Sequence, residues 1–275
     1  MRLRSIPGWS WRQLVRGLHR IGLISGVLIM ILGNAHAAPV FLLKPASAYF
    51  DDPATLALLD AALAGDLARA RTLVAQGANP NDEGPKSQPI NRIDLLDYSI
   101  AAGNSTAIKV LVAVGADPER IHQGPGNAFL FAMKLERLDL LELLLDLRPV
   151  ATLSKDTMEY LMFEARNRET LAVLLKKGAP IDFPDWAGYT ILMRTMDGQN
   201  FELAEWILLQ GASVMVESKS GMTPAYSVQY DLNKFRPGSP THDKVLRLKA
   251  LMEARGATFP ALDPQAVRER RKRRD

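Results

Sequence analysis

The sequence contains no cysteine, and this absence removes several kinds of chemistry at once. Without a thiol there can be no disulfide, no thiolate nucleophile, no iron–sulfur cluster and no cysteine-ligated zinc site. Histidine is scarce, with four in 275 residues, and aromatic residues make up only 7% of the chain. A catalytic or metal site would therefore have to be built from oxygen groups or isolated histidines.

The few histidines are too dispersed to form such a site. Beyond residue 37 only His122 and His242 remain, and they lie in different parts of the chain. The sequence has no Gly-x-Ser-x-Gly elbow, no His-Glu-x-x-His motif and no glycine-rich phosphate loop with a lysine. A solvated or capping role suits His122 better than catalysis. We therefore expect no catalytic residue, no metal site, no cofactor and hence no enzyme.

Excess positive charge is confined to the two ends of the chain. The formal net charge is +4, yet residues 1–37 hold five arginines and no acid, and residues 266–275 hold six basic residues against two acidic ones. Residues 38–265 consequently carry a net charge of −5. We expect residues 260–275 to be a basic, disordered, solvated tail, with attachment to an anionic membrane surface or to an acidic protein as the less favoured alternative. The tail has no interleaved aromatics, which argues against nucleic acid.

The first 37 residues have the pattern of a secretory signal peptide. A basic stretch precedes the apolar run 21–32, and Ala35 and Ala37 supply the small residues of a cleavage site. The alternative is an uncleaved inner-membrane anchor, because residues 40–43 are also apolar; however, Pro39 interrupts the run, which is shorter than the roughly 20 residues of a membrane span. We expect cleavage after Ala37 and a periplasmic location, where a cysteine-free chain cannot be wrongly cross-linked.

The body of the chain repeats one pattern, in which an apolar run is followed by Gly-Ala and then by a polar residue or proline. The residue that follows the apolar run is a glycine in five of the six copies and an arginine in the third, weaker copy. These residues are Gly77, Gly115, Arg148, Gly178, Gly211 and Gly256. The spacings are 38, 33, 30, 33 and 45 residues, around a period of about 33. Each copy reads as two short helices, because a glycine after a helix adopts the left-handed conformation that ends it. The pattern predicts an all-α array stabilised by stacking.

In its period and in its repeated residue pattern, the body of the chain resembles the ankyrin-repeat family. Residues 221–225 (Gly-Met-Thr-Pro-Ala) nearly match the family's Gly-x-Thr-Pro-Leu, and residues 185–192 carry a weaker copy. The resemblance implies an ankyrin-repeat solenoid of about six repeats over residues 54–259. Projecting β-turn fingers would join its helix pairs, and the first (inner) helices would form a concave binding face with the fingers.

Two segments depart from the repeat. Residues 38–53 contain several aromatic and apolar residues and three prolines, and we interpret them as an N-terminal cap over the open end of the first repeat. Residues 231–241 fall between the two helices of the sixth repeat, where the spacing is longest, and we interpret them as an insertion. Insertions in repeat arrays fall on loops and often make specific contacts.

The candidate partner-binding residues are Phe183, Trp186, Phe235 and Arg236. Phe183 and Trp186 fall on a predicted finger, and Phe235 and Arg236 fall in the predicted insertion. Aromatic residues and arginine dominate the energetics of protein interfaces. If fingers and inner helices form one surface, all four could touch one partner. The alternative for Trp186 is packing on a neighbouring finger, whereas Trp206 falls at a predicted core position.

Short matches at both ends of the array are similar to a group of exported bacterial ankyrin proteins. These are residues 49–53 (Tyr-Phe-Asp-Asp-Pro) and residues 255–260 (Arg-Gly-Ala-Thr-Phe-Pro). The resemblance implies a monomeric periplasmic scaffold that binds a protein partner, and an immunity role against a secreted antibacterial phospholipase-type effector. The alternative is a stress-protection or chaperone-like helper of a periplasmic enzyme such as catalase.

Overall fold

The computed structural model describes residues 42–85, 92–121 and 126–274. The predicted signal peptide and His122 lie outside these residues. The described part is all-helical, as expected, with thirteen α-helices, of which the first twelve form six consecutive pairs. The pairs are α2 (Pro53–Leu63) with α3 (Leu67–Ala75), α4 (Leu95–Ala101) with α5 (Ser105–Ala113), α6 (Ala128–Lys134) with α7 (Leu138–Leu147), α8 (Lys155–Glu164) with α9 (Arg168–Lys176), α10 (Ile191–Asp197) with α11 (Phe201–Leu209), and α12 (Pro224–Lys234) with α13 (Pro240–Glu253).

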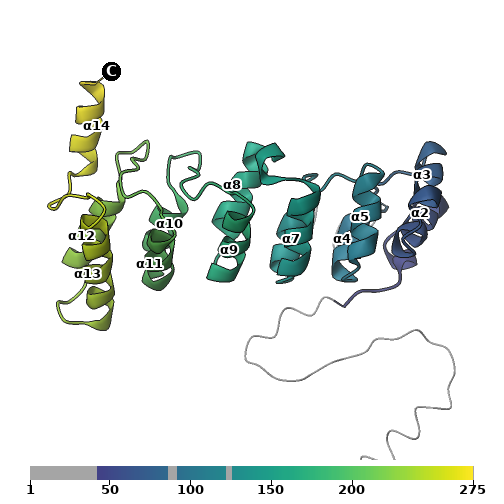
Figure 1. The fold of residues 1–275 in the computed structure, drawn as a ribbon, viewed down its shortest axis with the longest axis horizontal. Helices are drawn as coiled ribbons and strands as arrows, with labels where there is room; N and C mark the ends of the chain where they lie inside the picture. The colour runs from purple at the N-terminus through teal and green to yellow at the C-terminus, as the bar shows by residue number, and fades with distance from the viewer. Residues whose placement is uncertain (1–41, 86–91, 122–125, 275) are drawn as a thin grey trace, which may run out of the picture. The chain divides into compact units, whose positions relative to one another are not determined.

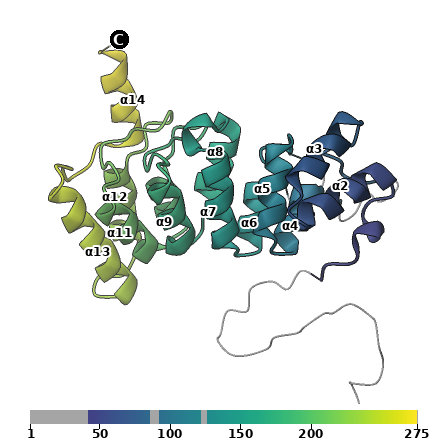
Figure 2. The same cartoon turned by 45° about the vertical axis from the view of Figure 1, so that its right-hand side comes forward.

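The six pairs stack in chain order as two rows of helices. The first helices α4, α6, α8, α10 and α12 contact one another in sequence, and the second helices α3, α5, α7 and α9 do the same. Figures 1 and 2 show the pairs following one another from α2 and α3 to α12 and α13. The surface formed by α8, α10, α12 and the connections that precede them is called the first-helix face of repeats 4–6 below.

Most helices begin where the sequence supplies a capping side chain; the exceptions among the described α-helices are α7 and α10, whose N-cap residues Arg137 and Thr190 accept no such hydrogen bond. Side chains of Asp or Asn accept a hydrogen bond from the third backbone N–H of most helices, as Asn104 does from Ala107 at 2.9 Å. The repeated glycine after the second helix lies at positive φ, +102° at Gly211. The predicted role of this glycine as a helix stop is therefore confirmed.

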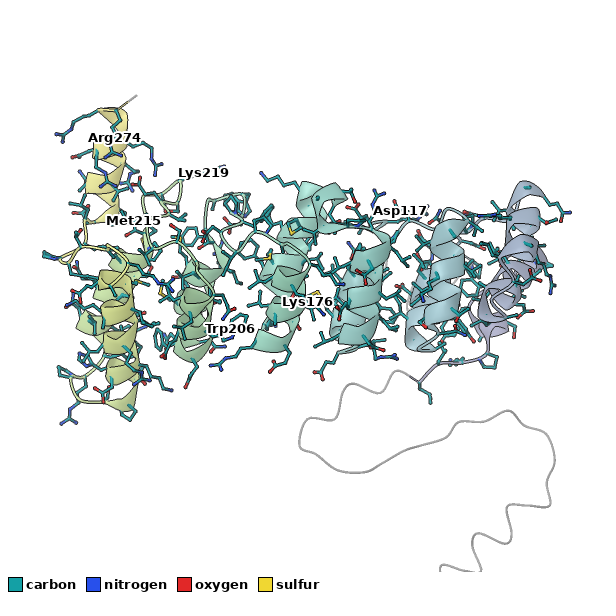
Figure 3. All side chains as sticks on the ribbon, viewed as in Figure 1. Asp117, Lys176, Trp206, Met215, Lys219 and Arg274 are labelled. Atoms are coloured by element: carbon teal, nitrogen blue, oxygen red, sulfur yellow. The ribbon has the colours of Figure 1, made fainter. Side chains whose placement is uncertain are left out.

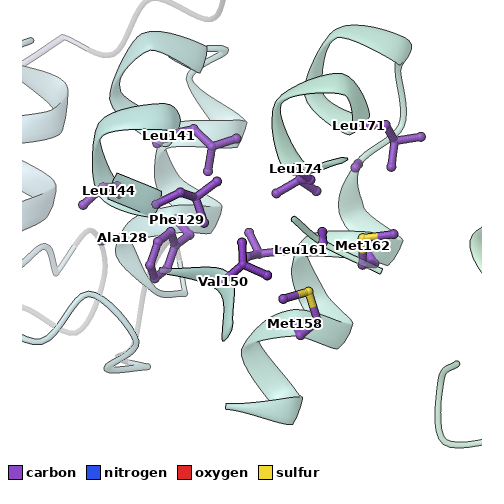
Figure 4. Packing of buried hydrophobic residues seen from close by; sticks show 14 of the residues in the cluster. Ala128, Phe129, Leu141, Leu144, Val150, Met158, Leu161, Met162, Leu171 and Leu174 are labelled. Atoms are coloured by element: carbon purple, nitrogen blue, oxygen red, sulfur yellow. The ribbon is translucent and has the colours of Figure 1, made fainter. Parts of the chain in front are cut away.

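The core runs continuously through the stack because every pair buries apolar residues against its neighbours. Figure 4 shows this packing in repeats 3 and 4, where Leu, Met, Val and Phe side chains fill the space between helix pairs. Phe129, Leu144 and Leu161 are fully buried there. Trp206 departs from its predicted core position and is only half-buried, since Leu203, Ala204, Ile207 and Leu208 occupy the buried face of α11.

The N-terminal cap contacts the second repeat as well as the first, and so it does not cover the open end of the first repeat alone. A short 3-10 helix (Ala46–Ala48) leads to Phe50, which is fully buried. The rings of Tyr49 and Phe50 lie 5.9 Å and 6.2 Å from the ring of Tyr98 in the second repeat, edge to face. The Tyr98 hydroxyl also donates to the Lys44 carbonyl at 3.3 Å. The cap thus fastens the first repeat to the second.

The predicted insertion at residues 231–241 is instead mostly helical. Residues 231–234 form the last turn of α12, and residues 240–241 begin α13. Only residues 235–239 connect the two helices. The long spacing of the sixth repeat arises mainly because α12 and α13, with 11 and 14 residues, are longer than α10 and α11, with 7 and 9 residues. The connection 235–239 adds only two residues to the three, 198–200, that join α10 and α11.

The tail that was predicted to be disordered contains a helix, α14 (Pro264–Lys272). Asp263 caps it, and Val267 is buried against the last repeat. Arg270 and Arg271 both pair with Glu217 of the preceding connection, and Arg268 donates to the carbonyl of Ser220 at 2.5 Å. These contacts offset the repulsion among the basic residues and order the segment. No helix in the described part of the chain is long and apolar enough to span a membrane.

Candidate protein-binding face

Three large aromatic side chains are exposed on the first-helix face of repeats 4–6. Tyr160 of α8 is 46% exposed, Trp186 of the connection before α10 is 70% exposed, and Tyr230 of α12 is 59% exposed. They belong to three consecutive repeats, and two grooves lie beside them. Exposed aromatics beside concave surfaces are typical of protein-binding sites.

The first groove, called the Trp186 groove, has a volume of about 530 Å³ and lies between α8, α10 and the connection 179–190. One side of it is a single stripe of α8, because its five lining residues there have helical spacing. They are Asp156, Glu159, Tyr160, Phe163 and Glu164. The groove thus combines apolar rings with carboxylates.

The connection that carries Trp186 is held rigidly. The buried Asp185 carboxylate accepts hydrogen bonds from the backbone N–H groups of Ala187 and Tyr189 at 2.8 Å and 2.9 Å, and from Arg194 of α10. Burial raises the pKa of Asp185, but the hydrogen bonds from Arg194 and the backbone outweigh it, so the net pKa lies below the ordinary value. The Arg194 guanidinium also lies 4.6 Å from the ring centre of Tyr189.

The next connection, 212–223, braces the first. Lys219 donates its backbone N–H to the carbonyl of Ala187 at 2.9 Å, and Ser213 donates its backbone N–H to Asp182 at 2.9 Å. Figure 3 shows Lys219 and Met215 on this connection, at the same edge of the array as α14. Trp186 is therefore exposed on a fixed backbone rather than packed on the neighbouring finger.

The second groove, called the Tyr230 groove, has a volume of about 510 Å³ and lies between α10 and α12. Its apolar surface comes from Met196, Met222, Tyr226 and Tyr230, and Pro264 at the start of α14 closes one edge. Its charged residues are Asp197, Asp231 and Lys234.

Asp231 is the unusual residue of this groove. It is only 7% exposed, yet no hydrogen bond or ion pair reaches its carboxylate within the described residues. Burial raises the pKa of Asp231, Lys234 lowers it, and the charge of Asp197 raises it further, for a net rise above the ordinary value. The Ser227 hydroxyl, which also lines the groove, is fully buried without a partner in the described part of the chain, whereas the Asp231 carboxylate keeps some contact with the groove. An unpaired buried carboxylate of this kind costs stability.

The four predicted partner-binding residues do not share one surface. Trp186 is exposed as predicted, and Phe183 beside it is half-buried against the core. Phe235 ends α12 and packs against Phe201, with the rings 5.9 Å apart, while Arg236 is exposed in the short α12–α13 connection. Trp186 precedes a first helix and Phe235 follows one, so they lie at opposite edges of the array, near opposite ends of the individual helices, as Figure 1 shows for the connections concerned.

Sequence reasoning missed Tyr160, Tyr230 and Asp231. Tyr160 lies among residues 157, 158, 161 and 162, which are buried, so the helical period would have marked it as exposed had the start of α8 been recognised. Asp231 was assigned to the insertion and thereby separated from Tyr230, although both belong to α12. In the described residues no group of three potential metal ligands comes together.

Comparisons with known proteins place this arrangement. No protein-family model and no curated protein matches the chain. Among solved structures, the ankyrin repeat domain of Bcl-3, a member of the IκB family, matches with a TM-score of 0.55 at 19% identity over 76% of this chain and 90% of that one. Other similar structures have TM-scores below 0.5. The ankyrin repeat domain of human ASB11 matches at 0.46 with 22% identity, over 78% of this chain and 88% of that one.

A further similar structure is a chain in a complex of a predatory endopeptidase from Bdellovibrio bacteriovorus with an immunity protein. Its TM-score is 0.42 at 19% identity, over 70% of this chain and 97% of that chain. The match to Bcl-3 agrees with the two rows of stacked helix pairs and the repeated glycine stops described above. The chain therefore has the ankyrin-repeat fold.

Proposed function

We propose that this protein is a binding scaffold whose first-helix face of repeats 4–6 holds a protein partner. The observation that carries the proposal is the exposure of Trp186 on an ordered connection, with the exposed Tyr160 lining the same groove and the exposed Tyr230 lining the next one. Large apolar rings held in water on an ordered backbone gain free energy when a partner covers them. The face needs no rearrangement to bind, because Asp185 and the connection 212–223 already fix it.

A second level of the proposed function concerns the compartment in which the scaffold acts and the protein that it binds. We infer an exported protein that acts in the periplasm as an immunity protein and neutralises a secreted antibacterial phospholipase-type effector. Export is supported by the sequence of residues 1–37, and the immunity role by the resemblance of residues 49–53 and 255–260 to exported bacterial ankyrin proteins.

Two experiments test these two levels separately. Protein purified from the osmotic-shock fraction is expected to begin at Ala38 by N-terminal sequencing; membrane-bound protein that retains the first 37 residues would contradict export by cleavage. If a lipase-type toxin gene lies beside the gene of this protein, production of that toxin in the periplasm is expected to stop growth unless this protein is produced with it. Growth arrest that this protein does not relieve would contradict the immunity role, and recovery of a catalase-type enzyme as the captured partner would favour the helper role.

The binding face itself is tested by capture of the partner on immobilised protein. The substitution Trp186→Ala is expected to weaken capture at least tenfold, because truncation of a central aromatic anchor costs about 2 kcal/mol or more. The matched control is Leu246→Ala on α13, a large residue that is 43% exposed on a second helix. Loss of capture in the control with none in Trp186→Ala would place the interface on the other row of helices.

A further inference from the structure

The Tyr230 groove contains a buried negative charge that the described part of the chain leaves without a counter-charge in hydrogen-bonding contact. Asp231 is 7% exposed and unpaired, and Asp197 of α10 adds a second carboxylate to the same groove. The charged groups that act on Asp231 are Asp197 and Lys234. The Lys234 ammonium lies 5.5 Å from the ring centre of Phe235 and makes no ion pair in the described residues.

We propose that the Tyr230 groove binds a cationic side chain, arginine or lysine, presented by the protein partner. The inference rests on the proposed function, in which a partner covers this face. Charge-assisted hydrogen bonds from a guanidinium or ammonium group would satisfy the buried Asp231 carboxylate. The groove also offers Met196 and Met222, on which the aliphatic stem of such a side chain can pack.

The aromatic residues of the groove suit the same ligand. Tyr226 and Tyr230 are four residues apart on α12 and therefore lie on one face of the helix. A cation over the face of an aromatic ring is attracted by the ring quadrupole, and the attraction grows when water is excluded. Tyr230 is 59% exposed and thus accessible to a partner.

The fifth repeat combines a buried carboxylate, an aromatic ring and a cation, and there the cation comes from the chain itself. There Arg194 of α10 pairs with the buried Asp185 and lies over the ring of Tyr189. Carboxylate, guanidinium and aromatic ring are all supplied by the chain itself. The Tyr230 groove has the carboxylate and the rings, and the partner would supply the cation.

The basic helix α14 does not fill this role. Of its arginines, Arg270 and Arg271 are held by Glu217, and Arg268 by the carbonyl of Ser220. Only Pro264 of α14 lines the groove. The groove therefore remains open to a residue from another molecule.

The test uses the full mature chain and a labelled, blocked tri-arginine peptide, with binding measured by fluorescence anisotropy. The neutral control peptide carries citrulline at the same positions, which keeps the shape and removes the charge. The test variant is Asp231→Asn, and the matched protein control is Asp60→Asn, which removes one exposed carboxylate from α2, the first helix of the first repeat. Asp231→Asn removes an unpaired buried charge and is expected to fold.

The arginine peptide is expected to bind the wild type at least tenfold more tightly than the citrulline peptide does. Asp231→Asn should weaken arginine binding at least tenfold, and Asp60→Asn by less than twofold. Affinity in the wild type should also fall as the pH approaches 3.8, the ordinary aspartate pKa, because burial raises the pKa of both groove carboxylates, Asp231 and Asp197. A pH dependence that is smaller in Asp231→Asn than in the wild type identifies the part that belongs to Asp231.

Three results would overturn the inference. They are equal affinity for the two peptides, equal losses in the two variants, which would indicate general charge attraction, and unchanged binding in Asp231→Asn. None of these would contradict the proposed function, because capture of the partner through Trp186 is measured independently. The opposite combination is also informative. If the groove binds the arginine peptide but Trp186→Ala leaves capture of the partner unchanged, the cation site is supported and the proposed protein-binding face is contradicted.

Discussion

At the scale of the residue, the backbone conformation decides which glycines are essential. Gly211 follows α11 with φ at +102°, whereas Gly198 ends α10 with φ at −76°. No atom would obstruct a side chain at Gly211, so any cost of substitution there comes from the backbone alone. The two positions therefore form a matched pair.

Gly211→Ala is expected to lower the free energy of unfolding by about 1–2 kcal/mol, because an L-residue is disfavoured at positive φ. Gly198→Ala should leave stability unchanged or raise it by up to about 1 kcal/mol, since alanine restricts the unfolded chain without strain in the fold. Urea denaturation measures both. Equal effects of the two substitutions would show that Gly211 does not end its helix as described.

A second residue-scale prediction concerns the pH dependence of stability. The folded pKa of Asp231 is raised by burial, so its ionised form is disfavoured in the folded chain. This group therefore destabilises the fold at pH values above its folded pKa, and the penalty disappears below 3.8, where both states are protonated.

Asp231→Asn is accordingly expected to raise the Tm at pH 7 and to have progressively less effect as the pH falls towards 3.8. Thermal unfolding followed by circular dichroism at several pH values gives the comparison, with Asp60→Asn as the control for net charge. A variant that is less stable than the wild type at pH 7 would mean that the Asp231 carboxylate makes a favourable contact within the fold.

At the scale of the element, α14 depends on one carboxylate. Glu217 accepts from both Arg270 and Arg271, and the Arg271–Glu217 distance is 3.2 Å. These side chains are partly exposed, so the pair contributes modestly, on the order of 1 kcal/mol after screening. The buried Val267 supplies the remaining attachment.

Glu217→Gln is expected to increase the rate of tryptic cleavage within α14 about fivefold, because local opening of the helix becomes more frequent. Glu269→Gln is the matched control, since Glu269 lies on α14 itself and contacts only Gln265, at 3.0 Å, among the described residues. Identical cleavage rates in the two variants would show that the glutamate does not hold the helix. The Tm of the repeats should change little in either.

The same element shows where sequence reasoning reaches its limit. The repeated Gly-Ala stops predict the number of repeats and most helix ends, because capping is local and each copy supports the others. Helix α14 could not be predicted in this way, since its only buried apolar residue is Val267 and its partner Glu217 lies in another connection. Only part of the candidate site could be predicted from the sequence. Trp186 stands on a finger in the sequence pattern, whereas Tyr160 and Asp231 required the true helix boundaries.

At the scale of the whole molecule, two tryptophans separate stability from binding. Trp186 is exposed, whereas Trp206 is half-buried against the core of α11 and its neighbours. Each repeat is stabilised mainly by the repeats beside it, so loss of packing in α11 weakens the stack.

Trp206→Ala is therefore expected to lower the free energy of unfolding by roughly 1–3 kcal/mol, because the ring loses about half the contacts of a fully buried one. Trp186→Ala should change it by less than about 0.5 kcal/mol, as is usual for surface positions. Denaturant unfolding of both variants distinguishes the two roles. If Trp186→Ala were as destabilising as Trp206→Ala, Trp186 would have to be a structural residue.

The central claim, that a protein partner covers the first-helix face of repeats 4–6, is tested most directly by site-specific photocrosslinking in living cells. A photoactivatable side chain is placed singly at Trp186, Tyr160 or Tyr230, or at the control positions Leu209 and Leu246, which are 58% and 43% exposed on α11 and α13. The account predicts one discrete crosslinked species of the same mass from the three test positions and none from the controls. Crosslinking from Leu209 and Leu246 alone, or from none of the five positions, would contradict it.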